Sequence, residues 1–354
     1  MSLYPRILFI VDAGPQVGGG HVMRSLTLAR ALAERGAPCA FLNAPGVAAM
    51  LSAFAPDMPR IDADLGDAQA LLEATDEAAF DAVVFDHYGL TAADHRQIGR
   101  GRPALTIDDL ADRPLAADIV VDSGPQRRAE DYQGLIPPGA RLLLGPGYAP
   151  VRPEFAALRG QALARTPGPV KRVLVAMGLT DVGGVTGEVL DRLRPRVGDA
   201  AIDIVLGDSA PSRGGLERLA RRDTRLRLHV DTPHMAELMA AADFAVGAAG
   251  SSSWERCTLA LPSLLVILAD NQRPAATALG AMGAALVVDP KTLDFDETFD
   301  RAVQRLLSDP STRARLSAKS AEVCDGLGAT RTADAFLELI AARDSTPRAQ
   351  DDFS

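Results

Sequence analysis

The fold is decided by Ile7-Leu8-Phe9-Ile10-Val11, which a short linker joins to Gly18-Gly19-Gly20-His21-Val22-Met23-Arg24. Apolar residues at helical spacing follow the glycines, so the pattern predicts a buried strand, a glycine turn and a helix. In α/β domains such a turn presents backbone N–H groups to a ligand. We therefore expect Gly19 and Gly20 to contact a substrate.

His21 is predicted to lie in the first turn of that helix, where the positive end of the helix dipole disfavours a protonated imidazole. A neutral imidazole accepts protons, so His21 is a candidate general base. The alternative is that the glycines form only a flexible turn and that His21 is an ordinary surface residue. Neither the dinucleotide-binding spacing nor the Lys-Ser/Thr of a P-loop follows the glycines, so the turn alone does not identify a ligand.

Length and composition favour a two-domain α/β protein, since the chain has 354 residues. The net charge of −9 argues against a nucleic-acid partner, whose phosphates need a basic face. The three cysteines are far apart, which gives no metal spacing and no disulfide framework and favours a reducing cytoplasm. Because no apolar stretch approaches about 18 residues, we expect neither a signal peptide nor a membrane span. A monomer is favoured.

The first half alternates short apolar runs with amphipathic segments. Continuous apolar runs between helices are typical of a parallel sheet covered on both faces. They predict strands at residues 6–11, 40–43, 82–86, 105–107, 119–121 and 142–144. This is the pattern of a Rossmann-like domain.

The second half repeats this pattern after a stretch dense in proline and glycine between residues 145 and 169, which predicts an interdomain linker. Strands are expected at residues 172–176, 202–206, 226–229, 244–247, 264–268 and 285–288, and C-terminal helices at 296–307, 310–327 and 330–342. We therefore predict a Rossmann-like domain over residues 1–168, a second one with the C-terminal helices over 169–342, and a frayed tail over 343–354.

Polar residues follow two predicted strands of the first domain, namely Asp86-His87-Tyr88 and Asp108-Asp109. In open parallel sheets, ligands bind just beyond the carboxyl ends of the strands, so these residues are candidates to line a pocket. The alternative is that the aspartates cap the following helices and that Tyr88 covers the edge of the sheet.

Three loops of the second domain are predicted to form the opposite wall of an interdomain cleft. They contain Gly178, the segment 247–255 and the pair Asn271-Gln272. Gly250, Ser251 and Ser252 place small side chains and free N–H groups at a helix start, which is suited to a diphosphate held without a metal. Glu255 is then placed to accept hydrogen bonds from a ribose diol. Alternatively, Ser252 or Ser253 is only an N-cap, and Glu255 only favours the helix dipole.

Six ordered motifs carry a resemblance that runs from about residue 6 to residue 290. They are Gly-Gly-His-Val-Met-Arg at 19–24, Asp-x-Tyr at 86–88, Ile-Asp-Asp at 107–109, Gly-Pro-x-Tyr-x-x-x-Arg-Pro-Glu-Phe at 145–155, Gly-Ser-Ser-x-Trp-Glu at 250–255 and Ala-Asp-Asn-Gln at 269–272. In these motifs the chain resembles the UDP-sugar hydrolases of pseudaminic acid biosynthesis, which have the GT-B fold of glycosyltransferases.

The resemblance implies roles for particular residues. His21 matches the proposed catalytic base, and Arg152, Glu255 and Asn271 match positions associated with substrate binding. Further substrate-binding candidates within the motifs and loops are Gly19, Gly20, Arg24, Tyr88, Gly178, Gly250, Ser251, Ser252 and Gln272. The family's second-domain loop usually reads Gly-Gly-Ser-Asp-Pro, whereas residues 178–182 of this chain read Gly-Leu-Thr-Asp-Val. The contacts of this loop and the sugar specificity are therefore not carried over from the resemblance.

The resemblance implies an inverting hydrolase that releases UDP and a free 2,4-diacetamido-2,4,6-trideoxy sugar without a cofactor or a metal. Asp108-Asp109 is then structural or sugar-binding rather than a metal motif. The leading alternative is a GT-B glycosyltransferase, in which His21 deprotonates an acceptor hydroxyl. Related transferases dock on membranes through apolar and basic patches, but residues 44–59 are apolar and contain no Lys or Arg. A third reading, a non-catalytic nucleotide-sugar binding protein, leaves His21 without a function.

Overall fold

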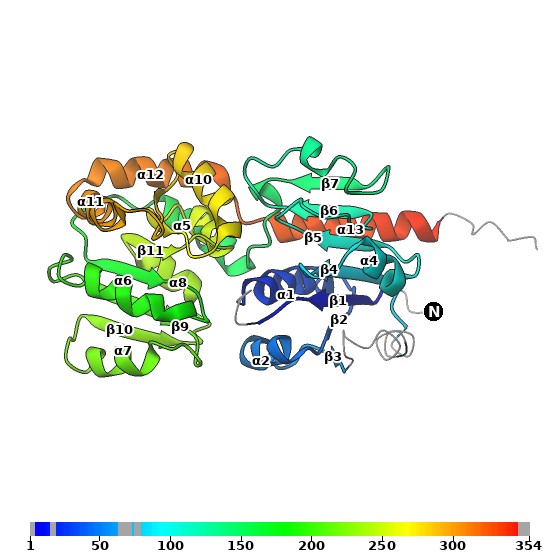
Figure 1. The fold of residues 1–354 in the computed structure, drawn as a ribbon, viewed down its shortest axis with the longest axis horizontal. Helices are drawn as coiled ribbons and strands as arrows, with labels where there is room; N and C mark the ends of the chain where they lie inside the picture. The colour runs from blue at the N-terminus through cyan, green and yellow to red at the C-terminus, as the bar shows by residue number, and fades with distance from the viewer. Residues whose placement is uncertain (1–3, 15–18, 63–72, 74–78, 346–354) are drawn as a thin grey trace, which may run out of the picture.

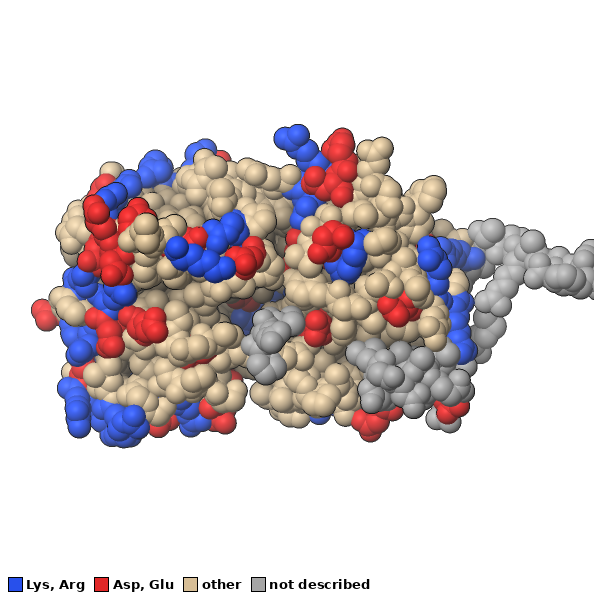
Figure 2. All heavy atoms as spheres, in the orientation of Figure 1, with Lys and Arg blue, Asp and Glu red and all other residues tan. Residues whose placement is uncertain are grey.

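The computed structural model describes residues 4–14, 19–62, 73 and 79–345, in two halves that each contain a parallel sheet (Figure 1). Gly18 of the glycine stretch and residues 346–354 of the predicted tail lie outside the described residues. Acidic and basic side chains are interspersed over the visible surface, which is hollowed where the two halves meet (Figure 2).

Within the described residues, the first sheet consists of β1 (Ile7–Val11), β2 (Cys39–Leu42), β3 (Arg60–Ile61), β4 (Ala82–Asp86), β5 (Ala104–Ile107), β6 (Ile119–Asp122) and β7 (Arg141–Leu144). The strands are hydrogen-bonded in parallel in the order β3-β2-β1-β4-β5-β6-β7. β1 therefore pairs with both β2 and β4, which places Val11 beside Asp86.

The second sheet consists, over the same described residues, of β8 (Arg172–Ala176), β9 (Ala201–Leu206), β10 (Leu226–Val230), β11 (Phe244–Ala248), β12 (Ser263–Val266) and β13 (Leu286–Val288). Its parallel order is β10-β9-β8-β11-β12-β13. The predicted strands of both sheets agree with the observed ones to within two residues. The sequence did not predict β3, because two residues give no periodic pattern.

Helices cover both sheets. In chain order they are α1 (Gly20–Ala33), α2 (Pro45–Phe54), α4 (Ala92–Gly99), α5 (Pro153–Leu163), α6 (Val185–Leu193), α7 (Arg213–Ala220), α8 (Met235–Ala241), α9 (Ser252–Thr258), α10 (Arg273–Ala281), α11 (Phe295–Ser308), α12 (Pro310–Val323) and α13 (Gly328–Asp344). Short 3-10 helices are η1 (Ala129–Tyr132), η2 (Pro146–Tyr148), η3 (Val182–Gly184) and η4 (Asp270–Gln272). None of the described helices is long and apolar enough to cross a bilayer.

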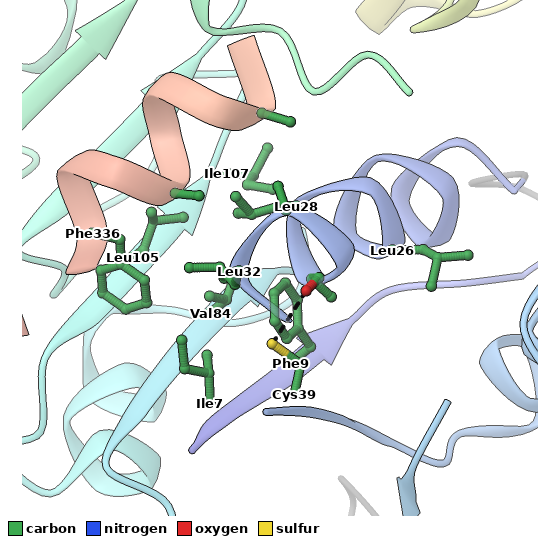
Figure 3. Packing of buried hydrophobic residues seen from close by; sticks show 14 of the residues in the cluster. Ile7, Phe9, Leu26, Leu28, Leu32, Cys39, Val84, Leu105, Ile107 and Phe336 are labelled. Atoms are coloured by element: carbon green, nitrogen blue, oxygen red, sulfur yellow. Dashed lines mark hydrogen bonds between the residues drawn. The ribbon is translucent and has the colours of Figure 1, made fainter. Parts of the chain in front are cut away.

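The core beside β1 shows why the opening stretch folds as it does. All five residues of β1 are buried, and Phe9 stacks on Phe41 of β2 with ring centroids 4.9 Å apart. Leu28 and Leu32 of α1 lie over this face of the sheet (Figure 3). Burial of such side chains contributes roughly 1.5–3 kcal/mol each. The start of α1 is thereby fixed at the carboxyl end of β1.

The chain crosses between the halves at places that differ from the predicted domain limits. Val151 and Phe155 already pack in the core of the second half, before the boundary expected near Pro169. The last helix, α13, returns to the first half and packs against α1 (Figures 1 and 3). Its Ala333 and Phe336 are fully buried there. The apolar face of α1 that turns away from the sheet needs a cover, and α13 supplies it.

Candidate active site

His21 forms a buried pair with Asp86. The imidazole Nδ1 lies 2.7 Å from Oδ1 of Asp86, and the two side chains are 6% and 0% exposed. The pair arises because α1 starts at the end of β1 and Asp86 ends the neighbouring strand β4. A histidine and an aspartate 65 residues apart in sequence are thus brought into contact by the order of the strands.

The short distance determines which ring nitrogen of His21 carries a proton. A carboxylate oxygen accepts hydrogen bonds only, so Nδ1 must donate to Asp86. In the neutral imidazole Nε2 is then the nitrogen that accepts a proton. No hydrogen bond from the described residues occupies Nε2. The arrangement is therefore that of a general base held by a carboxylate.

Arg24 shares the same carboxylate. Its Nε and Nη2 donate to the two oxygens of Asp86 at 2.8 and 2.6 Å, and its Nη1 donates to Asp109 at 3.0 Å. Burial by itself raises the pKa of Asp86, but the charges of Arg24 and then His21 outweigh it and hold this pKa well below its usual range. Asp86 is therefore ionised. Arg24, predicted to bind substrate, has its guanidinium nitrogens occupied by the two carboxylates.

Tyr88 connects the site to the second half. Its hydroxyl donates to Asp109 at 2.7 Å and accepts from Asn271 Nδ2 at 3.2 Å. Its ring meets that of His21 edge-on, with centroids 4.5 Å apart. Because Asn271 lies in η4 of the second half, this contact joins the two predicted walls. The structure thus places Tyr88 between His21 of the first half and Asn271 of the second.

The glycine turn also approaches the second half. A Cβ added at Gly20 would lie 3.3 Å from Oγ of Ser251, and one added at Gly19 would lie 2.6 Å from the terminal methyl of Met50. The start of α1 therefore lies close to Ser251 of the second half, with little space for a side chain at Gly20. On the second side, a Cβ at Gly250 would lie 3.8 Å from Nε2 of Gln272, so these two loops are neighbours as predicted.

Arg152 and Glu255 bind each other. Nε and Nη2 of Arg152 donate to the same oxygen, Oε1, of Glu255 at 3.1 and 3.0 Å. No hydrogen bond from the described part of the chain occupies Oε2, which remains free to accept one. The resemblance implied that both residues bind substrate. In the structure, Arg152 of the interdomain segment orients the carboxylate of α9.

The loop after β8, which departs from the family pattern, is held by hydrogen bonds to other parts of the second half. Gly178 has a φ of +109°, a conformation that favours glycine. Asp181 is fully buried and accepts hydrogen bonds from Thr186 N at 2.8 Å and from the hydroxyl of Ser212. Asp181 thus holds the loop to the start of α7 and is not available to a ligand. Leu179 packs toward Gly19 of the first half.

Asp108 and Asp109 are bound by protein groups. Oδ1 of Asp108 accepts from Arg113 at 2.9 Å, while Asp109 accepts from Arg24 and Tyr88. Over the described residues, no group of three or more His, Cys, Asp or Glu side chains is placed to hold a metal ion. Both carboxylates are thus engaged by side chains of the protein itself.

The contacts of two residues of this site, Asp86 and Arg256, were not predicted from the sequence. Asp86 was predicted only to line a pocket or to cap a helix, because its partner depends on the order of the strands. Arg256 received no role, although its guanidinium is buried beneath the 250–253 loop. No sequence signal indicates this burial, because Glu255 and several Ser and Thr residues also lie in α9.

Two Rossmann-like halves whose strand ends meet at one polar site define the GT-B fold. Residues 228–332 match the C-terminal domain of glycosyltransferase family 28. The structure of MurG from Acinetobacter baumannii superposes with a TM-score of 0.67 at 16% identity, over 94% of this chain and 99% of that one.

Two further proteins are similar to this chain along most of their length. UDP-2,4-diacetamido-2,4,6-trideoxy-beta-L-altropyranose hydrolase from Campylobacter jejuni subsp. jejuni serotype O:2 is 25% identical over 280 residues, which are 78% of this chain and 97% of the hydrolase. Spore coat polysaccharide biosynthesis protein SpsG from Bacillus subtilis is 25% identical over 336 residues, which are 93% of this chain and 96% of that protein. The resemblance and the fold expected from the motifs are confirmed.

Proposed function

We propose that this protein hydrolyses a UDP-linked 2,4-diacetamido-2,4,6-trideoxy sugar to UDP and the free sugar. The reaction would be a step in the biosynthesis of pseudaminic acid, a nonulosonic acid of the kind found on glycosylated flagellin. The observation that carries the proposal is the His21 and Asp86 pair, with Nε2 of His21 left to accept a proton beside the loops of the second half. Similarity to the named hydrolase supports the choice of substrate. The protein would act in the cytoplasm, as a monomer.

In the proposed reaction, water attacks the anomeric carbon and Nε2 of His21 takes its proton. The bond between that carbon and the diphosphate oxygen breaks, and UDP leaves with the electron pair. Asp86 keeps Nδ1 protonated and stabilises the imidazolium that forms. One base without a carboxylate nucleophile implies a single displacement, so the anomeric configuration inverts.

The second half would hold the nucleotide. Oε2 of Glu255 accepts from the ribose diol, and Arg152 fixes the orientation of that carboxylate. Backbone N–H groups of the 250–252 loop receive the diphosphate, beside Gln272. Tyr88 and Asn271 line the sugar side, and Gly19, Gly20 and Gly178 admit the substrate because they carry no side chain.

A glycosyltransferase is the second candidate, favoured by the match to the family 28 domain and by the likeness to MurG. The same His21 would then deprotonate an acceptor hydroxyl in place of water. Both reactions use a UDP-sugar donor and the same leaving group. They differ only in the nucleophile, so turnover in the absence of an acceptor separates them.

The test is release of UDP from a panel of UDP-sugars with no acceptor, in EDTA and in ¹⁸O-labelled water. We expect rapid release from one 2,4-diacetamido sugar, with the label in the sugar and an anomeric configuration opposite to that of the substrate. Full activity in EDTA is expected because the carboxylates of Asp108 and Asp109 are engaged by arginines. Label in UDP or retention of configuration would overturn the mechanism. UDP release that requires an acceptor alcohol would establish the transferase instead.

Replacing Glu255 by Ala is expected to weaken the binding of UDP itself by about 10- to 100-fold, because a ribose hydroxyl loses a charged acceptor. Isothermal titration calorimetry with UDP measures this. The matched control is Glu154→Ala, which removes another carboxylate 3.4 Å from Arg152 without touching the proposed ribose site. Equal UDP affinity in wild type and Glu255→Ala would contradict the assignment.

A further inference from the structure

Arg256 is a buried cation beneath the loop that follows β11. The residue is 1% exposed, and its Nη2 donates to the carbonyl of Ala248 at 2.7 Å and to Oγ of Ser253 at 3.0 Å. Its Nη1 donates to Oγ of Ser252 at 3.1 Å, and its Nε has no partner among the described residues. The guanidinium therefore lies against the inner side of the 248–253 segment.

The charge of Arg256 has no carboxylate partner in the described part of the chain. Arg24, also buried, is bound by Asp86 and Asp109, whereas Arg256 is bound only by a carbonyl and two hydroxyls. Burial lowers the pKa of Arg256 to about 10. An ionised group removed from water without a counterion is costly, and an anion bound nearby offsets that cost.

A glycine leaves the space that the guanidinium of Arg256 occupies. A Cβ added at Gly247 would lie 2.6 Å from Nη1 of Arg256 and 2.9 Å from the carbonyl of Ala176, so only glycine fits there. Ala176 ends β8 and Gly247 lies near the end of β11, the two central neighbours of the second sheet. The charge thus lies at the carboxyl ends of the strands, where ligands bind in parallel sheets.

The hydrogen bonds of Arg256 also set the direction of a serine hydroxyl. Because Oγ of Ser252 accepts from the guanidinium, its own proton is left to donate elsewhere. Ser252 is only half-buried and lies next to Ser251, which faces the glycine turn of the first half. Its hydroxyl can therefore donate to an anion on the cleft side.

We propose that Arg256 is a positioning residue that makes this loop select a diphosphate, by supplying a buried positive charge that no described carboxylate binds directly and by turning the Ser252 hydroxyl toward the ligand. The proposal rests on the proposed function, since the diphosphate is that of UDP. Arg256 does not touch the ligand itself. Its effect is confined to the phosphate part of the nucleotide, and the uracil and ribose parts are bound without it.

Calorimetry with UDP and with uridine tests this on wild type, Arg256→Gln and Arg256→Lys. Gln keeps a donor for the loop but no charge, so we expect UDP to bind about 10- to 100-fold more weakly while uridine changes by less than about twofold. Lys keeps the charge and is expected to restore part of the UDP affinity. Arg313→Gln is the matched control, because Arg313 is also buried and donates to backbone carbonyls in the last turn of α11.

The outcomes separate this proposal from the proposed function. If wild type binds UDP no better than uridine, the assignment of a UDP-sugar site fails, and the role of Arg256 fails with it. If wild type prefers UDP and Arg256→Gln keeps that preference, only the role of Arg256 is overturned. Should Arg256→Gln not fold, Ser252→Ala decides: unchanged UDP affinity refutes the proposal, and a selective loss for UDP supports it.

Discussion

His21→Ala should lower the turnover number by about 10²- to 10⁴-fold while leaving the affinity for UDP nearly unchanged. The imidazole acts on the proton that leaves the attacking water, so its removal affects the transition state and not the bound nucleotide. Steady-state kinetics of UDP release, together with calorimetric UDP binding, measures the two quantities separately. The buried contact with Asp86 is the reason for expecting the upper part of this range.

His87→Ala is the matched control for that experiment. His87 directly follows Asp86 at the end of β4 and is partly buried, but its Nδ1 accepts from Gly89 N at 3.0 Å within its own turn. Its loss should change turnover by less than about tenfold, because the proposed transfer of a proton from water does not involve His87. Near-normal turnover of His21→Ala, or an equal loss in both variants, would show that His21 is not the base.

The central strands of both sheets were predictable because they are short, apolar and buried on both faces. β1 is an example, since all five of its residues are apolar and all are buried. The glycine turn and the start of α1 were predictable for a related reason, because the change from a continuous apolar run to helical spacing occurs within a few residues. These are local signals, and they required no knowledge of which strands are neighbours.

Two kinds of contact were not predictable from the sequence. They are contacts that depend on the order of the strands in a sheet, and contacts of the last helix, which packs on the first half of the protein. Asp86 reaches His21 only because β4 pairs with the side of β1 opposite to β2. α13 covers α1, although its sequence position places it after the second sheet. An amphipathic helix shows that it has an apolar face but does not show which core will bury that face.

Arg256 illustrates a different limit. A single arginine after a serine-rich motif gives no indication from sequence whether it faces solvent or the interior. Its burial follows from Gly247, which lies nine positions earlier and leaves space for the guanidinium. A sequence pattern thus located the phosphate-binding candidate, and the structure was needed to find the charge beneath it.

Asp86→Asn should lower turnover by about 10²- to 10⁴-fold, although the side chain keeps its size. In wild type, the carboxylate forces the proton of His21 onto Nδ1. If the amide N–H₂ faces the ring, Nδ1 becomes the acceptor and Nε2 carries the proton, which removes the base. The variant should also lose stability by about 3–5 kcal/mol, because Arg24 loses its fully buried carboxylate partner.

Asp109→Asn separates the two effects of that substitution. It removes the other carboxylate from Arg24, at 3.0 Å, but leaves the hydrogen bond between His21 and Asp86 in place. Thermal unfolding should therefore show a loss of stability in both variants, while kinetics at a temperature where both are folded should show a large loss of turnover only in Asp86→Asn. If turnover falls in both variants in proportion to their loss of stability, Asp86 only stabilises the fold. The orientation of His21 would then not depend on Asp86.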